Sequence, residues 1–300
     1  MNPHESGRRA ATHPMDLPEP AALRQWIGRA EQQSDTLDAT RVRALWATLD
    51  HDDAAPAPGD ELPALATWMY FVGAARTDRL GPDGHAERGG FLPPVELPRR
   101  MWAGSRLQFH QPLRVGDAAQ QHARVDDVRV RQGRSGALVF VTVRHEICGP
   151  RGLAVTELRD IVYRAAPAAQ AAGPAVPQAP RDEEFSRTLR ADAVLLFRYS
   201  ALTFNAHRIH YDRGFATDVE GYPGLVVHGP LLATLLLDLV RCRHPGQRLQ
   251  RFDFRAVGPL FDVHAFTLCG RADGAARDAL WARDHQGRLA MQATAGWVSA

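Results

Sequence analysis

The sequence predicts an α+β protein made of two similar units, each with one helix against a curled antiparallel sheet. Segments that alternate between apolar and polar residues recur in both halves of the 300-residue chain, which is typical of antiparallel strands. A helix-like apolar segment precedes the strands of each half, at 64–75 and 231–241. The halves also echo each other, because 106–110 and 251–255 are each predicted to be a strand that leads through a proline-bearing turn to an aspartate. Chance similarity between β-rich segments is the alternative to a true repeat.

The chain divides into four parts by composition. Residues 1–20 lack the apolar core of a signal peptide and are expected to form a disordered tail. An N-terminal unit follows over 21–164, and its first segment, 21–49, has leucine and tryptophan at helical spacing. Residues 165–184 are rich in Ala and Pro, as linkers are, and a C-terminal unit occupies 185–300.

Six further strands are predicted from period-two alternation. They lie at 123–130, 138–147 and 155–163 in the first half, and at 264–270, 278–284 and 289–298 in the second.

Composition excludes several classes of function. A formal net charge of +2 gives no reason to expect nucleic-acid binding. Three scattered cysteines indicate neither a disulfide scaffold nor a zinc site, so a reduced cytoplasmic protein is expected. The longest apolar run, 224–240, contains His228, Pro230 and Asp238 and is too short to span a membrane.

The start of the leucine-rich segment is a candidate binding site for an oxygen that gains negative charge. Gly229 and Pro230 open a helix that is apolar nearly all round, so the helix is expected to be buried. Its first N–H groups then lie free at the positive end of a dipole in a dry place. Pro230 has no N–H, so Gly229 is the best donor. The alternative is a core helix without a ligand.

Just upstream, Asn205, His207 and His210 lie within six residues. Histidine can accept or donate a proton near neutral pH, whereas asparagine can hold a water or orient an imidazole but cannot act as a base. Asp212 precedes a short helical segment and is interpreted as its N-cap rather than as a catalyst. Metal binding by the two histidines is a weaker alternative, since no third ligand is evident.

This segment resembles the active-site stretch of the MaoC-like, (R)-specific enoyl-thioester hydratase and dehydratase family, whose pattern is Asp-x-Asn-Pro-Leu-His. Asn205 falls at the aspartate, His207 at the asparagine, Ile209 at the leucine and His210 at the histidine. Gly229 falls at the glycine whose N–H binds the thioester carbonyl.

The first half resembles the degenerate N-terminal unit of double hot-dog members, on the segments 89–94 and 131–136. It has no counterpart of the Asn-x-His-x-x-His motif, so one catalytic centre per chain is expected. The resemblance thus implies an α+β double hot-dog. The asparagine at 205 is similar to one branch, which includes mesaconyl-CoA and itaconyl-CoA hydratases and mitochondrial type 2 3-hydroxyacyl-thioester dehydratases.

The resemblance implies a hydro-lyase that adds water across the α,β double bond of an acyl-CoA thioester, with mesaconyl-CoA or itaconyl-CoA giving citramalyl-CoA as the best match. His210 would be the acid–base group, Asn205 would hold the water, and His207 would be a second base or a hydrogen-bonding partner. Gly229 N–H would bind the thioester oxygen, and Arg208 would pair with a second carboxylate of the substrate.

No cofactor or metal is expected, and neither nucleic acid nor a membrane is an expected partner. A homodimer is a possible assembly. Three alternatives stay open: a 3-hydroxyacyl-carrier-protein dehydratase of fatty acid synthesis, a thioesterase, and a non-catalytic protein that binds acyl thioesters.

Overall fold

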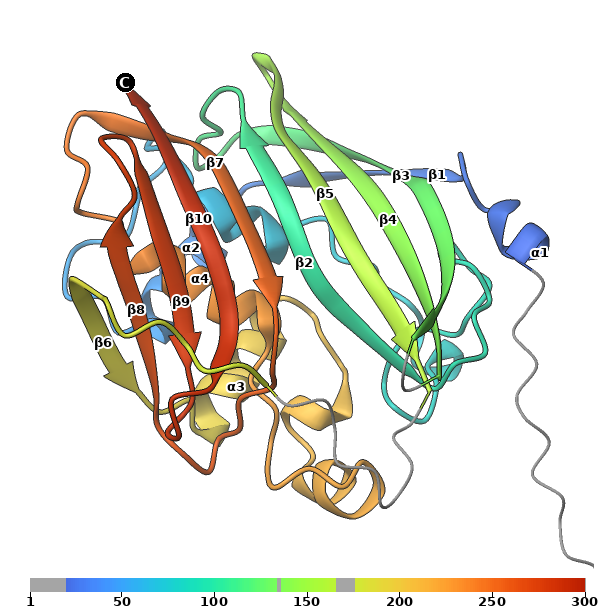
Figure 1. Cartoon of the computed structure of the whole chain (residues 1–300). Helices are drawn as coiled ribbons and strands as arrows, with labels where there is room; N and C mark the ends of the chain where they lie inside the picture. The colour runs from blue at the N-terminus through green and yellow to red at the C-terminus, as the bar shows by residue number, and fades with distance from the viewer. Residues whose placement is uncertain (1–19, 134–135, 166–175, 300) are drawn as a thin grey trace, which may run out of the picture.

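The computed structural model describes residues 20–133, 136–165 and 176–299, and its ten strands form one continuous antiparallel sheet (Figure 1). The strand order is β1-β3-β4-β5-β2-β7-β10-β9-β8-β6. The strands are β1 (Ala30–Thr36), β2 (Arg99–Phe109), β3 (Ala118–Gly133), β4 (Gly136–Gly149), β5 (Gly152–Arg164), β6 (Phe185–Leu189), β7 (Gln247–Ala256), β8 (Phe266–Ala272), β9 (Arg277–Arg283) and β10 (Leu289–Ser299).

The helices are short and most of them lie beside the second half of the sheet (Figure 1). The α-helices are α1 (Pro20–Arg24), α2 (Ala39–Thr48), α3 (Ala193–Leu202) and α4 (Gly229–Asp238). Single turns are η1 (Ala64–Met69), η2 (Thr77–Arg79), η3 (Arg208–His210) and the π-helical η4 (Phe215–Val219).

The two echoing sequence segments form the centre of the sheet, where one unit joins the other. Strand β2 pairs antiparallel with β7, and Arg106 lies opposite Asp253. The backbones approach closely at Gly104, because a Cβ there would lie 2.3 Å from the carbonyl oxygen of Phe254. Each of the eight strand segments predicted from the sequence overlaps a strand, and the strands of the two predicted units form one sheet.

A single large apolar core connects the two halves. Helix α4 contributes leucines at 231, 232, 235 and 236, which are all buried, as expected from its apolar sequence. Helix α2 of the first half packs into the same core through Val42 and Leu45. Helix α2 therefore packs into a core that both halves share, while a smaller apolar cluster that includes Val125, Val141 and Tyr163 lies on β3, β4 and β5.

Two helix predictions for the first half were wrong in extent. The segment 64–75 forms only the 3-10 turn η1, because Tyr70 takes an extended conformation and Phe71 has a φ of 55°. The segment 21–49 contains strand β1 between α1 and α2 instead of one helix. Strand β1 is a mostly exposed edge strand of polar residues, so it lacks the apolar alternation by which strands are recognised.

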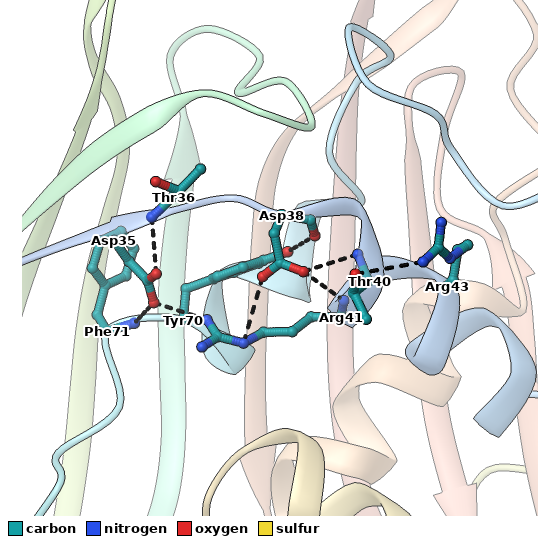
Figure 2. Close-up of polar contacts among 8 residues, drawn as sticks. All are labelled: Asp35, Thr36, Asp38, Thr40, Arg41, Arg43, Tyr70 and Phe71. Atoms are coloured by element: carbon teal, nitrogen blue, oxygen red, sulfur yellow. Dashed lines mark hydrogen bonds and ion pairs between the residues drawn. The ribbon is translucent and has the colours of Figure 1, made fainter.

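A polar network fixes this irregular region (Figure 2). Asp38 caps α2 by accepting from the N–H groups of Thr40 and Arg41, and its own carbonyl accepts from the Tyr70 hydroxyl at 2.6 Å. Asp35 accepts from Arg41 at 2.8 Å and from Phe71 N–H at 3.3 Å. The network replaces helical hydrogen bonds after η1 and holds Tyr70 and Phe71 in the cavity wall.

The four-part division of the chain stays a prediction, because the tail 1–19 and most of the linker, 166–175, lie outside the described residues. The end of the linker is bonded to the C-terminal unit, since Ala179 N–H donates to Gly287 and Leu289 N–H donates to Pro177. None of the helices in the described part of the chain is long and apolar enough to cross a membrane.

Candidate active site

One ring nitrogen of His210 makes a hydrogen bond to the backbone, and the other ring nitrogen is free to act as a base. Its Nδ1 lies 2.8 Å from the carbonyl oxygen of Val226 and must carry the proton, because a carbonyl can only accept. The lone pair of Nε2 is thereby left available as a base. Val226 N–H donates in turn to the carbonyl of Ile209, so these reciprocal bonds fix the turn η3 against the segment that precedes α4.

His228 connects this base to the start of helix α4. Its ring stacks on that of His210, with centroids 3.7 Å apart and planes inclined by 18°. Its Nε2 lies 2.8 Å from Ser200 Oγ, while its Nδ1 is buried with no partner in the described part of the chain. The sequence analysis did not assign a role to His228, although it immediately precedes the predicted oxyanion donor.

Gly229 begins α4 as predicted, with proline in the first turn. Its N–H lies at the first helical position, where no carbonyl four residues earlier can accept it, and it makes no hydrogen bond within the described ranges. Gly229 directly follows His228 in the chain, and the ring of His228 stacks on that of His210. The free N–H of Gly229 is therefore close to the His210 imidazole.

Asn205 lies just after α3 and is oriented by its own turn. Its side-chain oxygen accepts from the backbone N–H of His207 at 3.0 Å. A backbone N–H can only donate, so this bond assigns Oδ1 and leaves the Nδ2 donors for another partner. Phe204 before it has a φ of 50°, a left-handed conformation that is uncommon for a bulky residue and ends the helical run.

A loop of the first half reaches the site and was missed in the sequence. His85 packs on His207 with ring centroids 4.0 Å apart, and its Nδ1 lies 2.9 Å from a carboxylate oxygen of Asp83. The His207 ring lies edge-on to His210 at 5.4 Å. The sequence feature that could have indicated this loop is the turn 81–85, Gly-Pro-Asp-Gly-His, in which an acid and a histidine lie two residues apart.

The same loop touches the backbone of the histidine segment. Arg208 N–H donates to the carbonyl of Asp83 at 2.9 Å. Gly84 has a φ of +86°, and a Cβ on it would lie 1.9 Å from the carbonyl oxygen of Ala206. The first half has no Asn-x-His-x-x-His motif, but it supplies an Asp–His pair to the centre in the second half.

Arg208 has protein partners in this structure. Its guanidinium donates to Asp212, with the shortest contact at 2.7 Å, and to the carbonyl of Pro82 at 3.0 Å. It also lies over the ring of Phe215 at 4.3 Å. Asp212 accepts from Phe215 N–H, as an N-cap does. The prediction that Arg208 binds a substrate carboxylate stays a prediction, and these contacts suit a structural role.

A cavity of about 750 Å³ lies over the first-half sheet and extends to these residues. Its wall includes Asn205, Tyr211 and Pro230, the immediate neighbours of the histidine turn and of Gly229, and His85 from the opposite loop. His210 itself is 7% exposed and lies behind this wall. The remaining lining is largely aromatic and aliphatic, which suits an acyl chain: Trp68, Phe71, Phe91, Trp102, Val143, Ile161 and Phe197.

The buried histidines are neutral at pH 7. Burial lowers the pKa of His210 to about 4, against the opposing effect of the hydrogen bond to Val226. Burial is also the main reason why the pKa values of His207 and His228 lie below that of free histidine. Burial would raise the pKa of Asp83, but the hydrogen bond and charge of His85 reverse this, so Asp83 is an anion. The site therefore presents neutral imidazoles that can accept protons.

Three side chains here could hold a metal ion. Asp83, His85 and His207 each bring one ligand atom within 4.8 Å of the others. The metal-binding alternative from the sequence paired His207 with His210, whereas the structure groups His207 with the first-half loop.

Comparison with known proteins places the chain in a family. The profile of the hydroxyacyl-thioester dehydratase type 2 family matches residues 65–262. The chain is 46% identical over 269 residues to a mesaconyl-C(4)-CoA hydratase of Chloroflexus aurantiacus, with 90% of this chain and 95% of the relative covered. It is 27% identical to the mitochondrial hydroxyacyl-thioester dehydratase type 2 of Schizosaccharomyces pombe, over 67% of this chain and 75% of that one.

Solved structures share the fold. A MaoC-like dehydratase superposes with a TM-score of 0.68 at 15% identity, covering 93% of this chain and 99% of that one. HtdX of Mycobacterium tuberculosis gives 0.64 at 19% identity, covering 89% and 99%. A Mycobacterium tuberculosis protein described as a double hot-dog gives 0.56 at 14% identity, covering 91% and 96%. The double hot-dog fold is thus confirmed, and the chain is a hydro-lyase that belongs to the hydroxyacyl-thioester dehydratase type 2 family.

Proposed function

We propose that this protein catalyses the reversible addition of water across the α,β double bond of a dicarboxylic acyl-CoA, of which mesaconyl-C4-CoA is the best candidate. The observation that carries the proposal is a largely apolar cavity whose wall includes Tyr211 and Pro230, the chain neighbours of His210 with its basic Nε2 and of Gly229 with its free N–H. The name of the Chloroflexus aurantiacus relative supports the choice of substrate.

In this mechanism, His210 Nε2 removes a proton from water as the oxygen attacks the β-carbon. A lone pair at Nε2 and a proton fixed on Nδ1 are the protonation state that this step requires. The electrons of the double bond move toward the thioester carbonyl, and the oxygen gains negative charge. Gly229 N–H, at the positive end of a buried helix, stabilises that oxygen. Protonation of the α-carbon by the imidazolium then restores the base.

Asn205 and His207 would complete the site. The free Nδ2 of Asn205 can donate to the attacking water and align it with the imidazole. His207 lies between His210 and the Asp83–His85 pair, so it can orient His210 or accept a proton from it. The CoA arm would leave the cavity past the exposed rings of Phe197 and Phe204. A cytoplasmic location and a homodimer remain predictions.

Loss of the enoyl-thioester absorbance tests the proposal. We expect activity with mesaconyl-C4-CoA, less with crotonyl-CoA, and least with a long-chain enoyl-CoA. Fastest turnover of the long chain would instead favour the fatty-acid dehydratase alternative. Free CoA without a change in enoyl absorbance would show a thioesterase, and binding without turnover would show a non-catalytic protein; either result contradicts the proposal.

Replacement of Asn205 by aspartate tests how the water is held. Aspartate keeps the oxygen that accepts from His207 N–H but has no donor at Nδ2. If the amide donates to water, we expect kcat for Asn205→Asp to fall at least about tenfold, which corresponds to one lost hydrogen bond of about 1.5 kcal/mol. Unchanged or higher kcat would mean that the water is held by an acceptor, as in relatives with aspartate at this place.

A further inference from the structure

Strand β2 places an arginine in the wall of the cavity. Arg100 and Trp102 both line the cavity, whereas Met101 between them is 40% exposed on the other face. This alternation is what a strand imposes on successive side chains. Opposite Arg100 in the sheet lies Tyr163, which is 1% exposed, and burial raises the pKa of the Tyr163 hydroxyl against the smaller, opposing effect of the Arg100 guanidinium.

Unlike Arg99, Arg159 and Arg208, Arg100 has no acidic partner among the described residues. In the described part of the chain, no carboxylate oxygen lies within 4.0 Å of its guanidinium. Arg159, the other arginine in the cavity wall, makes two hydrogen bonds to Glu157, each at 3.1 Å. Arg99 pairs with Glu220 at 2.9 Å, and Arg208 pairs with Asp212. A partly buried cation without a counter-ion is costly, so an arginine in this setting suits an anionic ligand.

Arg100 lies in the same cavity wall as a residue of the histidine cluster. His85 also lines the cavity, and its ring packs on that of His207. His207 in turn lies next to His210, the proposed base. The cavity that Arg100 lines thus reaches the histidine cluster that includes the proposed base.

The proposed substrate carries a negative charge next to the carbon that reacts, so a cation is needed near that carbon. In a C4 thioester of 2-methylfumarate, the free carboxylate is attached to the β-carbon, the atom that water attacks. The carboxylate must therefore bind one bond away from the reacting atom and close to the base. A planar guanidinium can hold it with two parallel hydrogen bonds.

We propose that Arg100 binds the free carboxylate of the acyl group and makes the enzyme selective for β-carboxylated enoyl-CoA thioesters. This inference rests on the proposed hydratase function and assigns to Arg100 the role that the sequence assigned to Arg208. It also gives the first-half sheet a part in substrate selection.

The test compares two substrates that differ at this group, mesaconyl-C4-CoA and crotonyl-CoA, in wild type and Arg100→Met. We expect the ratio of kcat/KM for mesaconyl-C4-CoA to that for crotonyl-CoA to fall about a hundredfold in the variant, as expected for the loss of a charged hydrogen-bond pair. Arg106→Met is the matched control, because Arg106 is on the outer face of the same strand and pairs with Asp160. Its ratio should equal that of wild type.

Equal losses with both substrates in Arg100→Met would overturn the inference and leave the hydratase function standing. Wild-type protein that turns over neither substrate would instead overturn the proposed function. If Arg100→Met does not fold, calorimetry on wild type keeps the inference testable with succinyl-CoA and butyryl-CoA, saturated esters with a carboxylate or a methyl on the β-carbon. Tighter binding of succinyl-CoA supports the inference, and equal binding contradicts it.

Discussion

His210→Ala is expected to lower kcat by a hundredfold or more, because the variant has no group in position to take the proton from water. The hydrogen bond from Nδ1 to Val226 and the stacking on His228 hold the His210 ring in one orientation, with Nε2 left as the base. Steady-state hydration of crotonyl-CoA and mesaconyl-C4-CoA measures the loss. His122→Ala is the control, since His122 is exposed on strand β3 and should keep wild-type kcat.

The pH dependence of the wild type gives a second readout for the same residue. Burial lowers the pKa of His210 to about 4, so its Nε2 stays unprotonated and basic well below neutrality. We expect kcat/KM to be constant from about pH 8 down to pH 5 and to fall only near pH 4, with circular dichroism at each pH to confirm that the protein is folded. A fall centred near the ordinary histidine value of about 6.5 would contradict a desolvated base. A wild-type kcat in His210→Ala would contradict the role of His210 as the base.

Gly84→Ala is expected to lower kcat/KM by about a hundredfold or more, although Gly84 performs no chemistry. Its Cβ would lie 1.9 Å from the carbonyl oxygen of Ala206, so the first-half loop and the histidine segment must move apart. Ala206 follows Asn205 directly, and a displacement of about 1 Å in a catalytic segment can cost about a hundredfold in rate. The same substrates and assay measure the effect.

Gly116→Ala is the control that separates the effect of the clash with Ala206 from the effect of a positive φ at alanine. Gly116 also has a positive φ, +97°, but a Cβ there would meet nothing within 4 Å. Both variants therefore carry the strain of a left-handed alanine, roughly 1–2 kcal/mol, and both should show a lower Tm. Only Gly84→Ala should lose activity. If the two variants had kcat/KM values within about threefold of each other, the loop contact would not be needed for catalysis.

Regular alternation made most of the sheet predictable, and departures from it explain what was missed. Strands such as β4 alternate buried and half-buried residues along their length, which the sequence shows directly. Strand β1 is polar and at the edge of the sheet, and the 3-10 turn η1 has the apolar composition of a helix. The turn η1 ends where Tyr70 and Phe71 donate hydrogen bonds to Asp38 and Asp35. These partners are more than 30 residues away, so no local sequence pattern indicates them.

The candidate site could be proposed from the sequence where its residues are local in the chain, and their roles stay predictions. Asn205, His207 and His210 come from one segment, and Gly229 begins a helix as the sequence indicated. His85 lies more than a hundred residues from the histidine segment and is brought to it by the fold of the first half. Arg100 was likewise hidden, because a sequence does not show which of many arginines lacks an acidic partner.

A crystal structure with bound butyryl-CoA, an unreactive saturated ester, tests the central claim most directly. We expect the thioester oxygen to lie within about 3.2 Å of Gly229 N, and a water on His210 Nε2 to lie about 3–3.5 Å from the β-carbon. A thioester oxygen bound to another donor, or an acyl chain whose β-carbon has no water between it and His210, would contradict the account.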